Sequence, residues 1–331
     1  MTVLVTGGTG FIGSAIIREL LLGDEPVRAI TRRSVPQNAD SLLLPVQWVG
    51  ADVMDPTSLR FALRDCDTLY HVAGAIATHP SEAQLAFDVN VTGTRNLLDA
   101  ALVAGVRRVV YTASIFALGV GDAAIPPVNE NIDYNLEQLR SPYMRAKREA
   151  EAVIQEYRER GLDIVAVYPG FCAGPGDVYL TSSRFIVSFL KGILPGFPPS
   201  GLCQVDVRDA AHAHILAMYI SKPNEKFLVT GHNITYKQML EQLSSIIQRH
   251  LPLIPLPRAS LTLAGTIAER LSHRPLIDSG MTEILQYRWW YDDSKARVDL
   301  GIEYRPLEDT FRDAITWFAQ KGIISQRFAN L

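Results

Sequence analysis

Apolar positions along the chain switch repeatedly between the alternating pattern of strands and the wider spacing of helices. The first strand is predicted at residues 2–5, and Ile16, Ile17, Leu20 and Leu21 follow it at helical spacing. Further strands are predicted at residues 26–30, 46–50, 67–71, 106–112, 162–167 and 226–230. Helices are predicted at residues 14–22, from residue 56, and at residues 81–104, 143–159, 185–190 and 207–220. This alternation indicates an α/β protein whose parallel, doubly wound sheet is covered by helices on both faces.

The last third of the chain follows a different pattern. Residues 169–201 are rich in glycine and proline, and residues 251–257 form a proline-rich connector. Helices predominate from residue 235 onward, with two predicted near 259–271 and 310–320. We therefore predict a sheet domain of residues 1–168 plus 204–233, and a smaller, mostly helical lobe of residues 169–203 plus 234–331.

A glycine-rich turn, Thr6-Gly7-Gly8-Thr9-Gly10-Phe11-Ile12-Gly13, joins the first strand to the first helix. We expect Gly7 to allow a sharp turn, Gly10 to let a pyrophosphate approach the backbone, and Gly13 to let helix and strand pack closely. Free N–H groups and the positive end of the helix would bind the charge of that ligand. The alternative is a turn with a purely structural role. Strand, spacing and helix together predict a dinucleotide-binding domain of the Rossmann type.

The end of the second strand bears on which dinucleotide binds. An acidic residue there selects a free ribose 2′-hydroxyl, whereas arginine suits a 2′-phosphate. Arg32 and Arg33 stand at this place, so NADP(H) is the predicted cofactor and NAD(H) the alternative. Two solvated surface arginines are the other interpretation. Asp52 follows the third strand and is either a contact to the adenine amino group or a turn residue, while Asp55 is expected to cap the next helix.

The amino-acid composition indicates which kinds of molecule the protein binds. The 331 residues are 47% hydrophobic and carry 32 basic and 35 acidic side chains, for a net charge of -3. The two signs are mixed along the chain, which disfavours nucleic acid and favours a small-molecule substrate. Three widely separated cysteines suit a reducing compartment, and no apolar run is long enough to span a membrane, so we expect a cytoplasmic protein. His212 and His214 would point to different sides of a helix, and no metal site is predicted.

Three residues carry the predicted chemistry. Tyr143 and Lys147 lie four positions apart in a helix that Ser141-Pro142 would cap, so phenol and ammonium share one face. The cation is expected to lower the pKa of the tyrosine from about 10 toward working pH, as an acid or base requires. Ser114 stands at the end of the 106–112 strand, where its hydroxyl can bind the substrate oxygen that Tyr143 protonates. Each residue alone has an ordinary structural explanation, but together with a phosphate turn they predict hydride transfer.

A further motif interrupts the long predicted helix. Asn90-Val91-Thr92-Gly93-Thr94 lies in the interior of residues 81–104, where glycine and threonine are poor helix formers. Close packing or a binding site is expected to explain them.

On these motifs the sequence resembles the extended short-chain dehydrogenase/reductases, also called the NAD-dependent epimerase/dehydratase family, over nearly the whole chain. The matching stretches are Thr6 to Gly13, Asp52-Val53, His71 to Ala75, Asn90 to Thr94, the set of Ser114, Tyr143 and Lys147, Pro169 to Gly176, and Val205 to Ala211. The resemblance is nearest to the dihydroflavonol reductase-like subgroup, which includes proteins called hopanoid-associated sugar epimerases. It implies a Ser-Tyr-Lys catalytic triad and a homodimer formed through the helices at 81–104 and 143–159. The cofactor contacts that are predicted or implied are Gly7, Gly10, Phe11, Ile12, Gly13, Arg32, Arg33, Asp52, Val53, Ala73, Gly74, Asn90, Tyr143, Lys147 and Pro169.

Departures from the family pattern concern the substrate. Ile115-Phe116 stands where dehydratases of the family carry Asp-Glu, so sugar 4,6-dehydration is not expected. Phe171 belongs to a stretch in which many sugar-nucleotide enzymes carry an asparagine. Ile115, Phe116 and Phe171, with Ser114, are therefore predicted to line a site for a less polar ketone or aldehyde. The aromatic stretch 286–291 lies by the substrate cleft in the family, but for Trp290 we favour packing between the lobes.

We therefore predict an NADP(H)-dependent oxidoreductase that reduces a ketone or aldehyde or oxidises a secondary alcohol. Tyr143 is its acid/base, Lys147 its pKa modifier and ribose ligand, and Ser114 the residue that orients the substrate oxygen. The first alternative is an NAD-dependent nucleotide-sugar epimerase that keeps its cofactor bound and returns the hydride to the other face. The second alternative is a non-catalytic, dinucleotide-sensing regulator.

Overall fold

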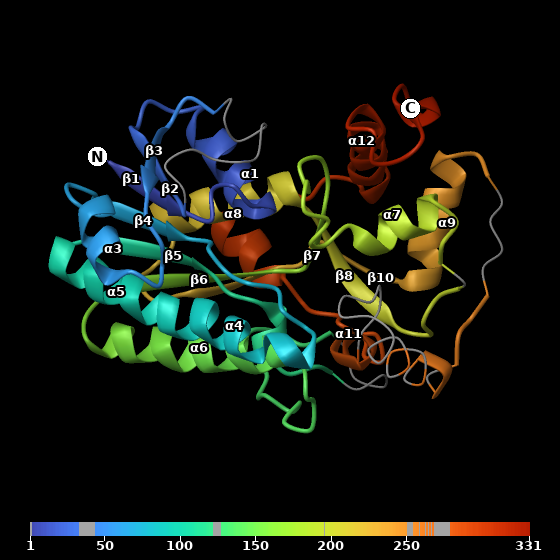
Figure 1. Cartoon of the computed structure of the whole chain (residues 1–331), viewed down its shortest axis with the longest axis horizontal. Helices are drawn as coiled ribbons and strands as arrows, with labels where there is room; N and C mark the ends of the chain where they lie inside the picture. The colour runs from blue at the N-terminus through green and yellow to red at the C-terminus, as the bar shows by residue number, and fades with distance from the viewer. Residues whose placement is uncertain are drawn as a thin grey trace.

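The computed structural model describes residues 2–32, 44–121, 127–194, 196–249, 254–257, 259–261, 263, 265, 267 and 279–331. A seven-stranded sheet fills one side of the molecule, and a smaller lobe adjoins it (Figure 1). Its strands are β1 (Val3–Thr6), β2 (Val27–Thr31), β3 (Gln47–Gly50), β4 (Thr68–His71), β5 (Arg108–Thr112), β6 (Asp163–Pro169) and β9 (Lys226–Val229). They lie in the order β3-β2-β1-β4-β5-β6-β9, and every neighbouring pair is parallel. The predicted doubly wound parallel sheet is confirmed.

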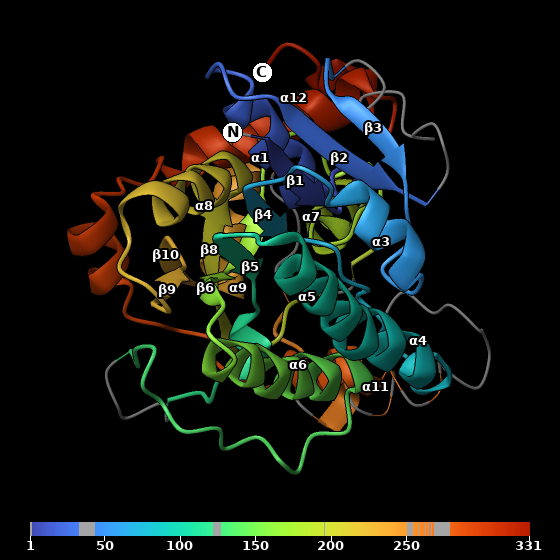
Figure 2. The same ribbon diagram turned by 90° about the vertical axis from the view of Figure 1, so that its left-hand side faces the viewer.

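Helices cover both faces of this sheet, as Figure 2 shows with α1 and α8 on one side and α5 and α6 on the other. They are α1 (Phe11–Leu20), α3 (Pro56–Ala62), α4 (Ala83–Phe87), α5 (Gly93–Ala104), α6 (Pro142–Glu159) and α8 (Val207–Ile220). The side chains of β1 alternate between the two layers. Val3 and Val5 pack in the cluster that contains α1 and α8, whereas Leu4 packs in the cluster with α3, α5 and α6. β1 is therefore buried on both faces, which explains its continuous apolar sequence.

The helix predicted at residues 81–104 is continuous but not regular. It begins with a 3-10 turn at Pro80–Glu82, continues as α4, widens into a π-helical turn at Asp88–Thr92 and then becomes α5. Gly93 explains why the sequence breaks helix preference here, because a Cβ at this position would lie 2.7 Å from Cγ2 of Val53. Close packing is thus one reason for the motif, as predicted.

A second, three-stranded sheet was not predicted. It contains β7 (Phe171–Ala173), β8 (Gly201–Asp206) and β10 (His232–Thr235) in the order β10-β8-β7, with β8 antiparallel to β10 and parallel to β7. All six residues of β8 are buried, so the sequence shows no alternation there. Residues 204–206, which we assigned to the sheet domain, lie in this smaller sheet, while β9 joins the large one. The division into two domains stays a prediction.

Helices of the C-terminal lobe pack on the small sheet, on the right in Figure 1. They are α7 (Arg184–Leu190), α9 (Tyr236–Ile246), α11 (Ser279–Ile284) and α12 (Leu307–Gln320), together with a 3-10 turn at Gln326–Phe328. A π-helical turn at Ala296–Leu300 packs instead with α8 and β9 on the large sheet. Residues 251–253 of the predicted connector and most of the predicted helix at 259–271 lie outside the described residues. Among the helices that are described, none is long and apolar enough to cross a membrane.

A buried histidine joins helix α8 to the sheet. His214 is fully buried, and its Nδ1 lies 2.7 Å from the Ala210 carbonyl oxygen while its Nε2 lies 2.9 Å from Thr112 Oγ1. A carbonyl only accepts, so Nδ1 carries the proton and Nε2 accepts from the threonine hydroxyl. Burial lowers the pKa of His214 to about 4, although the Ala210 carbonyl favours the charged form. His212 points the other way and contacts Glu19 at 2.8 Å, so the predicted divergence of the two side chains is confirmed.

We expect His214 to make the fold sensitive to acid. Because its pKa is about 4 when folded and near 6.5 when unfolded, its contribution is present above pH 6.5 and is lost as the pH falls toward 4. Replacing His214 by Gln, which keeps a donor and an acceptor but does not titrate, should reduce the loss of unfolding free energy between pH 7 and pH 5 by about 2 kcal/mol. Urea unfolding at both pH values measures this. An equal loss in wild type and variant would contradict it.

Candidate active site

The glycine-rich turn has the geometry that its sequence predicts. Gly7 has φ +68°, and a Cβ there would lie 2.8 Å from the Ala73 nitrogen. A Cβ on Gly13 would lie 2.2 Å from the Gly7 carbonyl oxygen, closer than any side chain allows. The turn role of Gly7 and the packing role of Gly13 are therefore confirmed. A Cβ on Gly10 would meet only the Gly7 oxygen, at 3.2 Å, and no side chain caps α1, so this end of the helix suits a phosphate.

Some residues around the glycine turn were predicted to contact the cofactor, and others support the turn by bonds within the protein. Phe11 is buried and Ile12 half-buried in the first turn of α1, and Gly74 is exposed beyond β4. Asn90 uses its amide within the protein: Nδ2 donates to the Ala75 and Ala86 carbonyls at 2.9 and 2.8 Å. From the π-helical turn it thus holds the loop after β4, which is where the cofactor contacts Ala73 and Gly74 are predicted.

The structure supports fewer of the contacts that we predicted to the adenosine part of the cofactor. Oδ1 of Asp52 accepts the Met54 N–H at 2.9 Å, which gives this residue the turn role that we considered for it. Asp55 caps α3 through the Thr57 N–H, as predicted. Val53 is buried, Pro169 ends β6, and exposed Arg32 directly follows β2. Arg33 lies outside the described residues.

A chain of buried hydrogen bonds links the ends of β1 and β4 to α5. Thr94 Oγ1 donates to the Asn90 carbonyl at 2.7 Å and therefore accepts from His71 Nε2, 2.9 Å away. His71 Nδ1 is then the acceptor for the Thr6 hydroxyl at 3.0 Å, and Thr6 Oγ1 accepts the Val72 and Ala73 N–H groups. Burial, helped by the charge of Lys147, lowers the pKa of His71 to about 3. A neutral His71 thus fixes the position of the glycine turn relative to the loop after β4.

The structure brings Ser114, Tyr143 and Lys147 together at the end of β5. Ser114 begins a 3-10 turn at Ile115–Ala117, directly after the strand. Tyr143 lies in the first turn of α6, and the nearby Ser114 hydroxyl acts to lower the pKa of its phenol. One turn later, Lys147 Nζ donates to the Thr112 carbonyl at 3.2 Å. All three side chains are buried, so a reacting group beside them would be shielded from water.

The expected lowering of the Tyr143 pKa is wrong in direction. Burial raises the pKa of Tyr143 to about 12, and the Ser114 hydroxyl only partly opposes this. Burial also lowers the pKa of Lys147 to about 8, while the Glu151 carboxylate acts in the opposite direction. Desolvation disfavours the charged form of both groups, and it is the largest cause of both shifts.

Glu151 is a site residue that our sequence analysis missed. It lies one turn beyond Lys147 on the same helix face, and its Oε2 accepts from the Tyr168 hydroxyl at 2.6 Å. Its Oε1 is buried without a hydrogen-bond partner. The spacing that paired Tyr143 with Lys147 also identifies Glu151, so the signal was present in the sequence.

Phe116 is the centre of an aromatic cluster beside Tyr143. Its ring centroid lies 5.9 Å from Tyr143, 5.6 Å from Phe171 and 4.7 Å from Trp289, in edge-to-face arrangements. Phe116 and Phe171 are thus brought to the site, whereas the buried Ile115 belongs to the core. Trp289 reaches the cluster from the C-terminal lobe and belongs to the aromatic stretch 286–291, which the resemblance placed by the substrate cleft.

Trp290, next to it, packs against the small sheet. Its Nε1 donates to the Ile234 carbonyl at 3.2 Å, and a Cβ on Gly201 would lie 2.5 Å from that nitrogen. Trp290 thus packs, but these contacts lie within the predicted C-terminal lobe and not between the lobes as we favoured.

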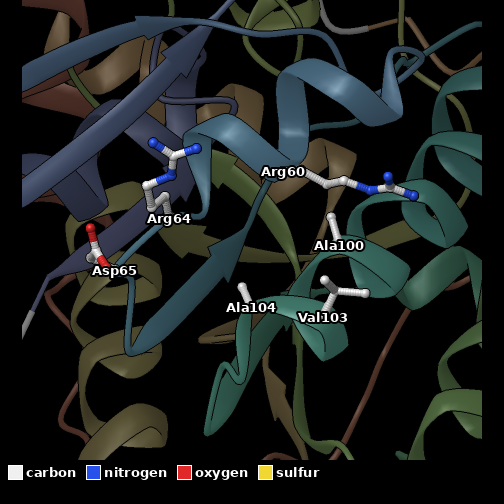
Figure 3. A pocket seen from close by; sticks show the side chains of 6 residues that line it. All are labelled: Arg60, Arg64, Asp65, Ala100, Val103 and Ala104. Carbon is white, nitrogen blue, oxygen red and sulfur yellow. The ribbon is translucent and has the colours of Figure 1, made fainter.

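A shallow pocket elsewhere on the domain is unrelated to this chemistry (Figure 3). It lies between α3 and α5 and is lined by Arg60, Arg64, Asp65, Ala100, Val103 and Ala104. These residues precede β4 and β5 in the chain, so the pocket is at the edge where strands begin. Ligands of open parallel sheets bind at the opposite edge.

Comparison with known proteins gives the class of protein. Residues 3–229 match the NAD dependent epimerase/dehydratase family, and the chain belongs to this family.

Individual relatives match over almost the full length. A putative dihydroflavonol 4-reductase of Synechocystis sp. is 32% identical, over 97% of this chain and 95% of the relative. Sterol demethylase protein B of Methylococcus capsulatus is also 32% identical, over 98% of this chain and 100% of the relative. The crystal structure of gox2253 superposes with a TM-score of 0.85 at 30% identity, covering 98% of this chain and 99% of the other.

The tight packing at Gly13 predicts a strong effect of a single methyl group. Gly13→Ala should displace the turn, weaken NADPH binding at least about tenfold and destabilise the fold by about 1–3 kcal/mol. Gly23→Ala is the matched control, because a Cβ there meets only the Leu20 oxygen at an ordinary 3.6 Å. Fluorescence titration with NADPH and thermal unfolding measure the two effects. Equal affinity in Gly13→Ala and wild type would be inconsistent with this role.

Proposed function

We propose that this protein is an NADP(H)-dependent oxidoreductase that reduces a ketone or aldehyde or oxidises a secondary alcohol. The observation that carries the proposal is the convergence of Ser114, Tyr143 and Lys147 at the end of β5, on the same sheet edge as the glycine turn. The geometry of that turn fits a dinucleotide phosphate, and hydride transfer is the chemistry that a bound nicotinamide dinucleotide supplies.

The protonation states favour the reductive direction. With a pKa of about 12, Tyr143 keeps its proton at neutral pH and can donate it to the oxygen of a carbonyl that becomes an alkoxide. The Ser114 hydroxyl, buried beside the phenol, orients that oxygen. Lys147, with a pKa of about 8, is mostly charged at pH 7 and stabilises the negative charge that develops beside it.

The surroundings support an apolar substrate. Phe116 and Phe171 are half-buried and meet edge to face next to Tyr143, where sugar hydroxyls would find few partners. Both relatives named above carry names that refer to ring compounds, a dihydroflavonol and a sterol. We therefore propose a ketone or aldehyde with an extended apolar ring system as the substrate.

Epimerisation is the second candidate, and the family description, which includes epimerases, is the observation that favours it. An epimerase would purify with tightly bound NAD and would turn over no added NADPH. A dinucleotide-sensing regulator would bind the cofactor without turnover of either kind, although it would not need an intact Ser-Tyr-Lys set.

Assembly and location form part of the proposal. Leu85 and Phe87 of α4 are 48% and 45% exposed, which supports a homodimer through α4, α5 and α6. All three cysteines are buried and free, which supports a reducing, cytoplasmic environment.

The proton donor gives the central test. We expect wild-type protein to oxidise NADPH with members of a panel of aromatic and polycyclic ketones and aldehydes, and Tyr143→Phe to lower kcat about 10³-fold with little change in NADPH affinity. Absorbance at the NADPH band and fluorescence titration measure the two quantities. Tyr219→Phe is the control, because that tyrosine is 53% exposed on α8, on the other face of the sheet.

Two outcomes would overturn the proposed function. Retained NAD without NADPH turnover would move the assignment to an epimerase. Cofactor binding without NADPH turnover or epimerisation would move it to a regulator, and unchanged activity in Tyr143→Phe would remove that residue as the proton donor.

Arg32 is the residue that we propose for cofactor choice. It is exposed directly after β2, where a ribose 2′-phosphate would lie in a dinucleotide fold. Arg32→Asp should weaken NADPH at least about tenfold and NADH much less, because the carboxylate repels a phosphate but can bind a hydroxyl. Lys237→Ala, which removes an exposed cation on α9, is the control. Equal weakening of both dinucleotides would remove Arg32 from the assignment.

A further inference from the structure

One segment of the C-terminal lobe contacts both loops that carry the proposed catalytic residues. This segment, residues 283–291, starts at the end of α11 and reaches the small sheet, where the Trp289 N–H donates to the Gly201 carbonyl at 3.0 Å. It is more than a hundred positions away in sequence from those loops, as the separations of 143 and 172 residues in its hydrogen bonds show.

At one end of the segment, Glu283 caps the helix that carries Tyr143. Its Oε2 accepts the N–H groups of Arg140 and Ser141 at 2.8 and 3.0 Å. Ser141, at the N-cap position of α6, makes no side-chain capping bond, and its hydroxyl is buried without a partner. The cap that we predicted from Ser141 is therefore wrong, and Glu283, from another part of the chain, binds the N–H groups of the two residues that precede the helix. Negative charge at a helix N-terminus is stabilising, and hydrogen bonds to a carboxylate are strong.

At the other end, Tyr291 holds the turn that follows Ser114. Its buried hydroxyl lies 3.0 Å from the Gly119 carbonyl oxygen and 3.3 Å from that of Ile115. The two carbonyls lie on either side of Phe116, whose ring packs edge to face on Trp289 with centroids 4.7 Å apart. The hydroxyl and the indole thus fix the backbone and a side chain of the same turn.

From these contacts we propose that Glu283 and Tyr291 are positioning residues, which hold Tyr143 and Ser114 at the mutual geometry that proton transfer requires. The proposal rests on the proposed function. Hydrogen-bonded reacting groups tolerate little displacement, and a shift of about 1 Å can cost about a hundredfold in rate. Neither residue contacts the glycine turn in the described structure, so cofactor binding should not depend on them.

The test compares four variants of the full-length protein. Glu283→Ala removes the acceptor, Glu283→Gln keeps an uncharged acceptor, and Tyr291→Phe removes the hydroxyl. Asp292→Asn is the matched control, because this exposed carboxylate on the adjoining residue contacts Ser294. For each, kcat, KM and the NADPH dissociation constant are measured, with hydrogen exchange of the peptides that span residues 113–121 and 138–146.

We expect Glu283→Ala and Tyr291→Phe to lower kcat about tenfold or more with an unchanged NADPH dissociation constant. Exchange should accelerate at 138–146 in the first variant and at 113–121 in the second. Glu283→Gln should recover most of kcat, and Asp292→Asn should behave as wild type.

Unchanged kcat in both variants, or a parallel loss of kcat and NADPH binding that Glu283→Gln does not relieve, would overturn the positioning role. If wild type turned over no carbonyl, the proposed function would fail instead. Hydrogen exchange would then still decide the positioning role, because wild-type exchange at both loops in Glu283→Ala and Tyr291→Phe would refute it.

Discussion

The close contact between Gly13 and the Gly7 carbonyl is the constraint on which the rest of the site depends. It fixes where α1 starts relative to β1, and so where the helix end that suits a phosphate lies. A Cβ on Gly7 would lie only 2.8 Å from the loop after β4. Hydrogen bonds of Thr6 and His71 join this loop to β1. A backbone packed this closely has no freedom to adjust locally, so the neighbouring elements share one fixed geometry.

The sequence predicts best where one residue type satisfies a strict local requirement. The period of the apolar positions predicts the parallel sheet and α8, and the need for residues without a Cβ predicts the glycine turn. The role of Asp55 follows because its side chain is favoured at a helix N-cap. The small sheet could not be predicted from the sequence, because β7 is only three residues long and β8 is buried throughout. Family membership was correctly anticipated because its motifs lie at the ends of strands.

Prediction of the site failed in two physical respects. The sequence places Tyr143 and Lys147 on one helix face, but it does not reveal how completely both are buried, and burial determines the direction of each pKa shift. Contacts between distant segments were the second gap. Glu283 reaches residues 140–141 across the fold, and no local pattern marks it. Trp289 lies in the aromatic stretch that the sequence singles out, but the sequence does not show that its partner is Phe116. Only the tertiary structure could reveal them.

The π-helical turn at Asp88–Thr92 has a consequence for how this site tolerates changes in chain length. Such a turn holds one residue more than a regular helix does, and this extra residue lets Asn90 reach Ala75 while α5 keeps its own contacts with α3. Losing one residue here would restore a regular helix and remove the wider turn from which Asn90 reaches Ala75. The segment is thus more sensitive to deletion than to many substitutions, and the length of this helix is itself part of the binding site.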